Sequence, residues 1–167
     1  MEDIIKKVCF TGKRPASMPW GDDETDPRCE RLKRRLEEEI LQAVRDGYRY
    51  FITGMAQGAD TWAGEIIIRL REKQYPDLFL EAAVPYYVQP KTWPEQDQIR
   101  YFDLLFDCDK KTLCSPSYYR GCYHVRNRYM VDAAQRVIAV YDGSGGGTGY
   151  TINYAQSKGR DVRIISF

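Results

Sequence analysis

The chain has 167 residues, of which 43% are hydrophobic, so we expect residues 1–167 to form a single globular domain with one core. The 25 basic and 24 acidic side chains nearly cancel, which argues against a nucleic-acid binder held by bulk charge. No signal-peptide pattern or membrane-length apolar segment is present, and five cysteines without a C-x-x-C pair favour reduced thiols. We therefore expect a cytoplasmic protein with no membrane contact, and the single histidine argues against a metal site; no cofactor is expected.

The first predicted strand, residues 4–10, runs into the motif T-G-K-R-P at residues 11–15. Ligands of open α/β sheets bind where the strands end, so Thr11, Gly12 and Arg14 are candidate ligand-binding residues. The alternative is an ordinary turn with solvated charges.

The first predicted helix follows an irregular segment, residues 16–26. Asp26 can cap the helix, Pro27 suits its first position, and Gly47 suits its end. Apolar residues at helical spacing mark its buried face: Leu32, Leu36, Ile40 and Val44.

A second strand, residues 50–53, is followed by the glycine turn G-M-A-Q-G-A-D and a helix that ends before Pro76. Gly54 and Gly58 permit close approach of a ligand to the backbone. Asp60 either caps the helix, which is the commoner use of such a residue, or accepts a hydrogen bond from a ribose hydroxyl.

Residues 78–84 are a third predicted strand. Thr92 and Glu95 match a capping box for a helix that runs to about residue 107, with Trp93 just inside it. Residues 111–114 form a short predicted strand, and the Tyr-rich segment 115–122 a loop. We interpret His124 as a hydrogen-bonding residue, because no nucleophile stands beside it in a recognisable motif.

The stretch from Arg126 to Gly147 contains the end of a helix, a strand at residues 137–140 and a glycine-rich turn. A further helix, predicted from Thr148 to about residue 158, would offer its unpaired N–H groups and its positive dipole end to an anion. Arg126 is a candidate bidentate donor to the same anion. The alternative is a flexible connector and a surface arginine. A last strand is predicted at residues 162–165.

The alternation of strands and helices predicts a three-layer, Rossmann-like α/β fold with a mostly parallel sheet and helices on both faces. The chain has no G-x-G-x-x-G fingerprint, so an ordinary dinucleotide dehydrogenase is not supported.

Four segments, at residues 11–15, 52–60, 126–132 and 138–147, together resemble the YpsA-like family of the SLOG superfamily, which also holds the LOG proteins and DprA. The resemblance implies a Rossmann-like fold that binds a nucleotide or a nucleotide derivative where the strands end. It also implies that homo-oligomers can form. The family more often has T-G-H-R-P in the first segment, and Lys13 stands at the histidine position.

The resemblance places the ligand in the loops that follow the strands. Arg126 and the turn of Gly145 to Thr148 would hold phosphate, and Asp60 a ribose hydroxyl. Trp93 or one of Tyr118, Tyr119 and Tyr123 would stack on a base. The full set of candidate ligand-binding residues is Thr11, Gly12, Arg14, Gly54, Gly58, Asp60, Arg126, Asn127, Asp142, Gly145, Gly146, Gly147 and Thr148.

The leading hypothesis is therefore a nucleotide-binding domain, with a sensory role as one form of it. A second hypothesis is a hydrolase of N-glycosidic or phosphoester bonds, as the resemblance to LOG proteins suggests. The carboxylate that follows Gly-Thr in those proteins is absent after Thr148, which leaves Asp60 and Glu65 as weak catalytic candidates and the question of an enzyme open. A third hypothesis is a DprA-like module that binds single-stranded nucleic acid through aromatic stacking.

Overall fold

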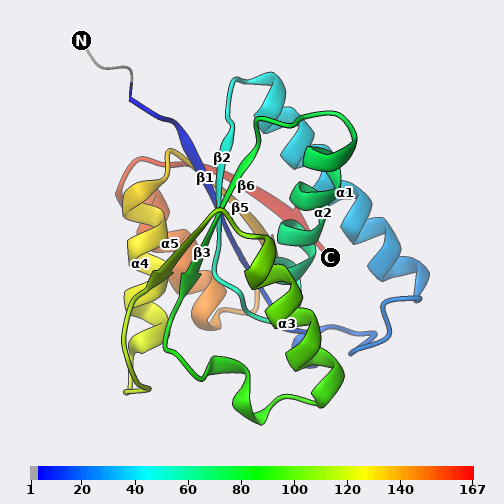
Figure 1. Ribbon diagram of the computed structural model, residues 1–167, viewed down its shortest axis with the longest axis vertical. Coiled ribbons are helices and arrows are strands. Elements are labelled where there is room, and N and C mark those ends of the chain that lie inside the picture. Colours follow the sequence, from blue (N-terminus) through cyan, green and yellow to red (C-terminus); the bar gives the residue numbers. More distant parts are fainter. Residues whose placement is uncertain (1–3) are drawn as a thin grey trace.

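The computed structural model describes residues 4–167, and across them six parallel strands form one sheet in the order β4-β3-β2-β1-β5-β6 (Figure 1). The strands are β1 (Lys7–Gly12), β2 (Tyr50–Thr53), β3 (Phe79–Val84), β4 (Lys110–Leu113), β5 (Arg136–Tyr141) and β6 (Asp161–Ser166). The order reverses between β1 and β5, which are neighbours in space although most of the chain separates them.

Helices cover both faces of the sheet (Figure 1). They are α1 (Pro27–Arg45), α2 (Ala59–Lys73), α3 (Glu95–Asp107), α4 (Cys122–Ala133) and α5 (Gly146–Ser157), with short 3₁₀ turns η1 (Pro15–Ser17) and η2 (Gln89–Thr92). The first three helices pack on one face, and α4 and α5 pack on the other. The predicted three-layer α/β architecture is confirmed.

The central strands are buried on both faces, as expected for a parallel sheet covered by helices. On β1, Val8 and Phe10 point into the core beneath α1 and α2, and Cys9 points into the core beneath α4. Each of these three side chains is at most 1% exposed. Because successive side chains of a strand point to opposite faces of the sheet, this one short strand contributes side chains to both hydrophobic cores.

The start of α1 follows its sequence signals. The Asp26 carboxylate accepts a hydrogen bond from the backbone N–H of Arg28 at 2.8 Å, and Pro27 occupies the first helical position. The predicted cap is therefore confirmed.

Three predicted boundaries are wrong. β1 begins at Lys7, because Ile4 and Ile5 extend beyond the sheet and are 83% and 65% exposed. The capping box does not form: Pro94 precedes α3 without a side-chain cap, and Thr92 belongs to η2. Trp93 lies outside the helix with an extended backbone, the conformation favoured before a proline.

The third wrong boundary is the start of α5, which begins at Gly146, two residues before Thr148. Gly145 precedes it with φ of 85°, a conformation that glycine adopts without strain. The glycine run is therefore partly the first turn of the helix.

Within residues 4–167, no helix is both long enough and apolar enough to cross a membrane.

Candidate functional site

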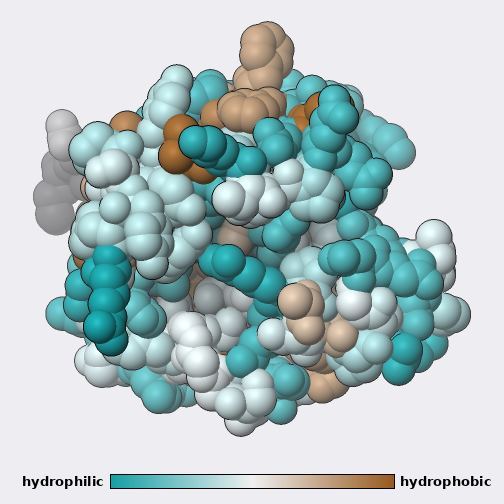
Figure 2. All heavy atoms as spheres, turned by 90° about the horizontal axis from the view of Figure 1, so that it is seen from below, coloured by the Kyte–Doolittle hydropathy of each residue, from teal (hydrophilic) through white to brown (hydrophobic). Residues whose placement is uncertain are grey.

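A pocket of about 500 Å³ opens at the carboxyl ends of β1 and β5, where the strand order reverses. This is the position at which open α/β sheets bind ligands. Figure 2 views the molecule from this end of the strands and shows a hollow in the middle of a largely hydrophilic face. The pocket is lined by Phe10, Thr11, Gly12, Lys13, Arg14, Ala16, Ser17, Ala56, Asp60, Tyr123, His124, Arg126, Asn127, Gly146, Gly147 and Thr148.

The glycine loop between β5 and α5 forms one wall of the pocket. Gly145 and Gly146 have φ of 85° and 73°, and the Gly145 N–H donates to the Tyr141 hydroxyl at 2.6 Å. The first residues of α5, Gly146 to Thr148, face the pocket. N–H groups of a first helical turn have no partner within the helix, so this wall suits an anion.

Lys13 connects this wall to the loop after β1. Its ammonium group donates to the Gly145 carbonyl at 2.7 Å, and its backbone N–H donates to the Val140 carbonyl at 3.1 Å. Next to it, the Arg14 guanidinium lies 4.8 Å from the centre of the Tyr123 ring, a cation–π distance. Lys13 therefore lies beside the start of α5, and Arg14 adds a second cation to the same pocket.

Arg126 forms the floor of the pocket and is only 3% exposed. Its Nη1 donates to the Gly54 carbonyl, and its Nε donates to Asn127 Oδ1 at 2.8 Å. Burial lowers the pKa of Arg126, while the nearby charge of Asp60 opposes that shift. Arg126 thus joins α4 to the loop after β2.

Asp60 is a buried carboxylate, 6% exposed, in the first turn of α2. One oxygen, Oδ2, accepts from the Ala56 N–H at 3.2 Å, while Oδ1 has no hydrogen-bond partner within residues 4–167. Burial raises the pKa of Asp60, and the positive charge of Arg126 opposes the shift. The N-cap of α2 is Gly58, so the alternative interpretation of Asp60 as the cap is wrong.

Because Gly54 has no side chain, Asp60 and Arg126 both approach the same side of its backbone closely. A Cβ atom at Gly54 would stand 2.7 Å from Asp60 Oδ2 and 2.8 Å from Arg126 Nη1. Both distances are shorter than a normal contact, so this position excludes any side chain unless its neighbours shift.

The residue after Gly54, Met55, adopts φ of 61°, which is unusual for a residue other than glycine. Two contacts hold the loop in this conformation: Gln89 Nε2 donates to the Met55 carbonyl at 3.2 Å, and the Met55 N–H donates to Thr53 Oγ1 at 3.3 Å. Strained backbone of this kind often lies at functional sites.

The structure brings most of the predicted ligand-binding residues into the pocket. Gly54 lies behind Arg126, and Gly145 precedes α5 and accepts from Lys13. Neither of these two glycines lines the pocket itself, and the same is true of Gly58 and Asp142. The space beside Gly58 is filled by Pro15, 3.1 Å from where a Cβ would lie, and the exposed Asp142 accepts from the Ser144 N–H at 3.0 Å.

Sequence reasoning missed His124 as a residue of the pocket. It lies in the first turns of α4, two residues before Arg126, and its ring centre is 4.5 Å from that of Tyr150. The signal available in the sequence was its position on the helix that carries Arg126.

Of the aromatic candidates for base stacking, Tyr123 lines the pocket, whereas Tyr118 and Tyr119 do not. Trp93 lines a separate depression next to α3, together with Asp97 and Tyr101.

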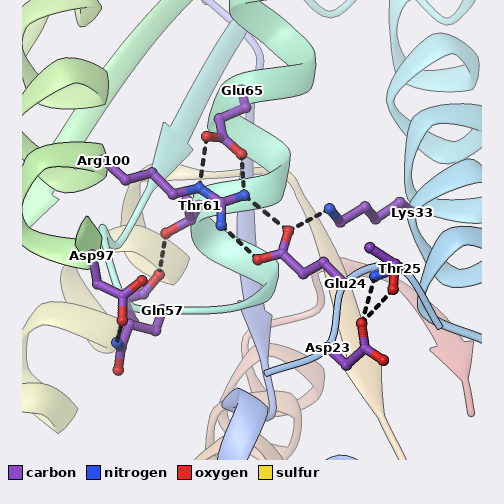
Figure 3. A network of polar contacts seen from close by, with 10 residues as sticks. Asp23, Glu24, Thr25, Lys33, Gln57, Thr61, Glu65, Asp97 and Arg100 are labelled. Carbon is purple, nitrogen blue, oxygen red and sulfur yellow. Dashed lines mark hydrogen bonds and ion pairs between the residues drawn. The ribbon is translucent and has the colours of Figure 1, made fainter. Parts of the chain in front are cut away.

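Of the two candidate carboxylates, Asp60 lies in the pocket and Glu65 does not. Glu65 Oε1 accepts from Arg100 Nη2 at 2.6 Å, and the same guanidinium contacts Glu24, which also pairs with Lys33 (Figure 3). This network ties the loop before α1 to α1, α2 and α3 and serves the packing of the helices.

Comparison with known proteins shows the family of the chain. The family model described as the YspA SLOG family, YpsA, matches residues 8–166. The chain belongs to the YpsA family of SLOG proteins. Among its relatives, a UPF0398 protein of Bacillus cereus strain B4264 is 27% identical over 171 residues, covering 98% of this chain and 89% of the relative. A UPF0398 protein of Halalkalibacterium halodurans is 25% identical over 142 residues, covering 81% of this chain and 75% of the relative.

Two solved structures share the fold. DNA processing protein A (DprA) of Streptococcus pneumoniae superposes with a TM-score of 0.64 at 16% identity, covering 98% of this chain and 51% of that protein. The Helicobacter pylori DprA, described for its single-stranded DNA binding mode, gives a TM-score of 0.60 at 14% identity, covering 96% of this chain and 65% of that protein. The YpsA-family chain thus spans half to two thirds of these proteins, and the likeness concerns the fold.

Proposed function

We propose that the pocket binds a nucleotide or a nucleotide derivative, with its phosphate at the start of α5. The observation that carries the proposal is the convergence of three features on one pocket: the first turn of α5, the cations Lys13 and Arg14, and the buried carboxylate of Asp60.

The first two features suit the phosphate. The N–H groups of Gly146, Gly147 and Thr148 and the positive end of the helix dipole favour an anion. Lys13 Nζ would be 3.2 Å from a Cβ on Gly146, so the ammonium group is next to the same backbone. A charged hydrogen bond of this kind contributes more than a neutral one.

The third feature suits a sugar. Asp60 Oδ1 is buried without a partner among residues 4–167, and such an atom gains by accepting a hydrogen bond. A ribose hydroxyl is a donor of the right kind. Tyr123, whose ring Arg14 covers, supplies an aromatic surface within the same pocket.

The experiment is thermal unfolding of the purified protein with AMP, ADP, ADP-ribose, NAD and UDP-sugars. A ligand at about 100 times its Kd adds about 2.7 kcal/mol of stability, which corresponds to roughly 5–10 °C for a chain of this size. Gly147→Val should abolish the shift, because Gly147 lines the pocket and a bulky side chain there would hinder a phosphate at the start of α5. A Cβ at this position meets no atom within 4 Å, so the substitution should not disturb the fold. The matched control is Asn153→Val, at an exposed position further along α5, which should retain the shift.

The proposal fails if none of these nucleotides shifts the transition. It also fails if Gly147→Val responds to them as the wild type does.

A second candidate function is binding of single-stranded nucleic acid. Its support is the aromatic group beside the pocket, in which Tyr86 packs edge-on against Tyr118 and Tyr123 with ring centres 5.5 and 5.9 Å apart, and Tyr118 is 61% exposed. Exposed aromatic rings next to cations such as Arg14 stack on unpaired bases. Retention of oligonucleotides that decreases steeply with salt would support this function, and no retention at low salt would exclude it.

A further inference from the structure

A group of exposed hydrophobic side chains lies on the side of the molecule opposite to β6. We call it the α3 patch; it consists of Tyr87, Val88, Ile99, Phe102, Phe106 and Leu113, which are between 47% and 84% exposed. Helix α3 and the edge strand β4 lie at the front of Figure 1, and Figure 2 shows hydrophobic side chains along its upper margin, which is the same side. Contiguous exposed hydrophobic surface of this kind marks an interaction site.

The centre of the α3 patch is a stripe along one helix. Ile99, Phe102 and Phe106 are spaced at i, i+3 and i+7, so they share the outward face of α3, while Tyr101 and Leu104 are buried on its inner face. Beside the stripe, a largely apolar groove of about 440 Å³ lies between α3 and β4. A helix face with this stripe and groove is built to pack against another helix.

Charges of opposite sign flank the stripe. On the side of β4, Lys91 and Lys111 line the apolar groove. On the side of α2, Asp103 and Asp107 line a separate depression between α2 and α3. None of these four side chains forms a salt bridge within residues 4–167.

We propose that the α3 patch joins two copies of this chain about a twofold axis. The axis is parallel to α3 and lies in front of the stripe, between the two copies. Rotation by half a turn about this axis brings the stripe of one copy against the stripe of the other. It also places the acidic flank of each copy opposite the basic flank of its partner. A twofold interface requires a patch that is complementary to itself, and a hydrophobic stripe between flanks of opposite sign meets that requirement.

Pairing of the two β4 edges is disfavoured by the same residues. Lys110 and Lys111 are exposed on this edge strand, and charged side chains there oppose edge-to-edge association. Contact through α3 buries the hydrophobic stripe and leaves the lysines to face carboxylates. The nucleotide pocket shares no lining residue with the α3 patch, so dimer formation does not depend on the proposed ligand.

The experiment is sedimentation velocity across a concentration series, at low salt, on the full chain. The wild type should form a dimer with a Kd of about 1 μM or tighter, the weak end of the range for standard-size interfaces. Phe106→Glu should raise the Kd at least about tenfold, because the carboxylate would be forced against the stripe of the partner. At 84% exposed, Phe106 contributes little to the fold, and an unchanged circular dichroism spectrum checks this.

The matched control is Ile164→Glu on β6, where a hydrophobic side chain is 47% exposed outside the α3 patch. It should leave the Kd unchanged. Asp103→Lys should weaken the dimer, and adding Lys111→Glu to it should restore much of the loss, since the exchanged charges again face each other across the twofold axis.

A wild type that stays monomeric up to about 100 times the expected Kd would overturn the proposal. So would a dimer that Phe106→Glu does not weaken. A monomeric wild type would instead indicate that the α3 patch binds a different protein.

Discussion

Gly54→Ala tests whether Asp60 and Arg126 are held where the structure places them. The added methyl group would lie 2.7 Å from Asp60 Oδ2, 2.8 Å from Arg126 Nη1 and 2.9 Å from Arg126 Cζ. Overpacking in a buried site costs about 1–3 kcal/mol. If Arg126 also loses its hydrogen bond to the Gly54 carbonyl, the free energy of unfolding decreases by about 1.5–3 kcal/mol more. The backbone of Gly54 is not in the left-handed region, so alanine would cause no backbone strain there. The loss of stability would come from the steric clash of the added methyl group.

Urea unfolding measures this loss as a change in the free energy of unfolding. The matched control is Gly147→Ala, whose added methyl group meets nothing within 4 Å and which should change stability by less than about 0.5 kcal/mol. If Gly54→Ala is as stable as this control, then the two charged groups are not packed against Gly54 and the geometry of the pocket floor is wrong.

Three further predictions concern ionisable groups elsewhere in the fold. Burial alone would raise the pKa of Glu81, but hydrogen bonds from Tyr129, Tyr50 and Thr112 hold this pKa below its usual value. The stability that the Glu81 carboxylate contributes is therefore lost as the pH falls through its pKa in the folded protein. Glu81→Gln should destabilise the protein by about 1.5–3 kcal/mol at pH 7 and show a shallower loss of stability in acid titrations. Although burial opposes the shift, Arg100 and Lys33 lower the pKa of Glu24 to about 2. Glu24→Gln should therefore lower the midpoint of thermal unfolding at pH 7. The difference in midpoint between this variant and the wild type should shrink as the pH falls from 4.5 to 2. Because every cysteine except the half-buried Cys114 is buried, a thiol reagent should modify at most one group quickly in the native protein, and all five only after unfolding.

The fold could be predicted because most strands and most helix ends carry local signals. Apolar runs marked most of the strands, glycine turns followed β2 and β5, and Asp26 with Pro27 marked the start of α1. In a parallel sheet the ends of all strands lie at one edge, so the loops after β1, β2 and β5 had to meet once the strand order was known. The location of the pocket followed from this reasoning.

The contacts that shape the pocket could not be predicted, because they join residues far apart in the chain. Nothing local indicates that Lys13 donates to Gly145, or that Arg126 donates to the carbonyl of Gly54. Glu81 illustrates the same limit. A carboxylate within an apolar strand gives no sign of which hydroxyl groups from other elements will surround it.

The start of α3 was mispredicted for a local reason. Thr92 and Glu95 have the right spacing for a capping box, but Pro94 between them keeps Trp93 extended. A proline between the two residues of the motif therefore prevents the capping box from forming.

The bond between Lys13 and Gly145 has a consequence for how the pocket is assembled during folding. It spans 132 positions of the chain, and the bond between Arg126 and Gly54 spans 72. The cost of closing such long loops is met only after the intervening strands have paired, so the pocket is completed late. A truncated chain without β1, or without α5 and β6, would keep individual glycine turns but no complete site. The pocket is thus a property of the whole domain, and a ligand bound in it would protect both ends of the chain from unfolding at once.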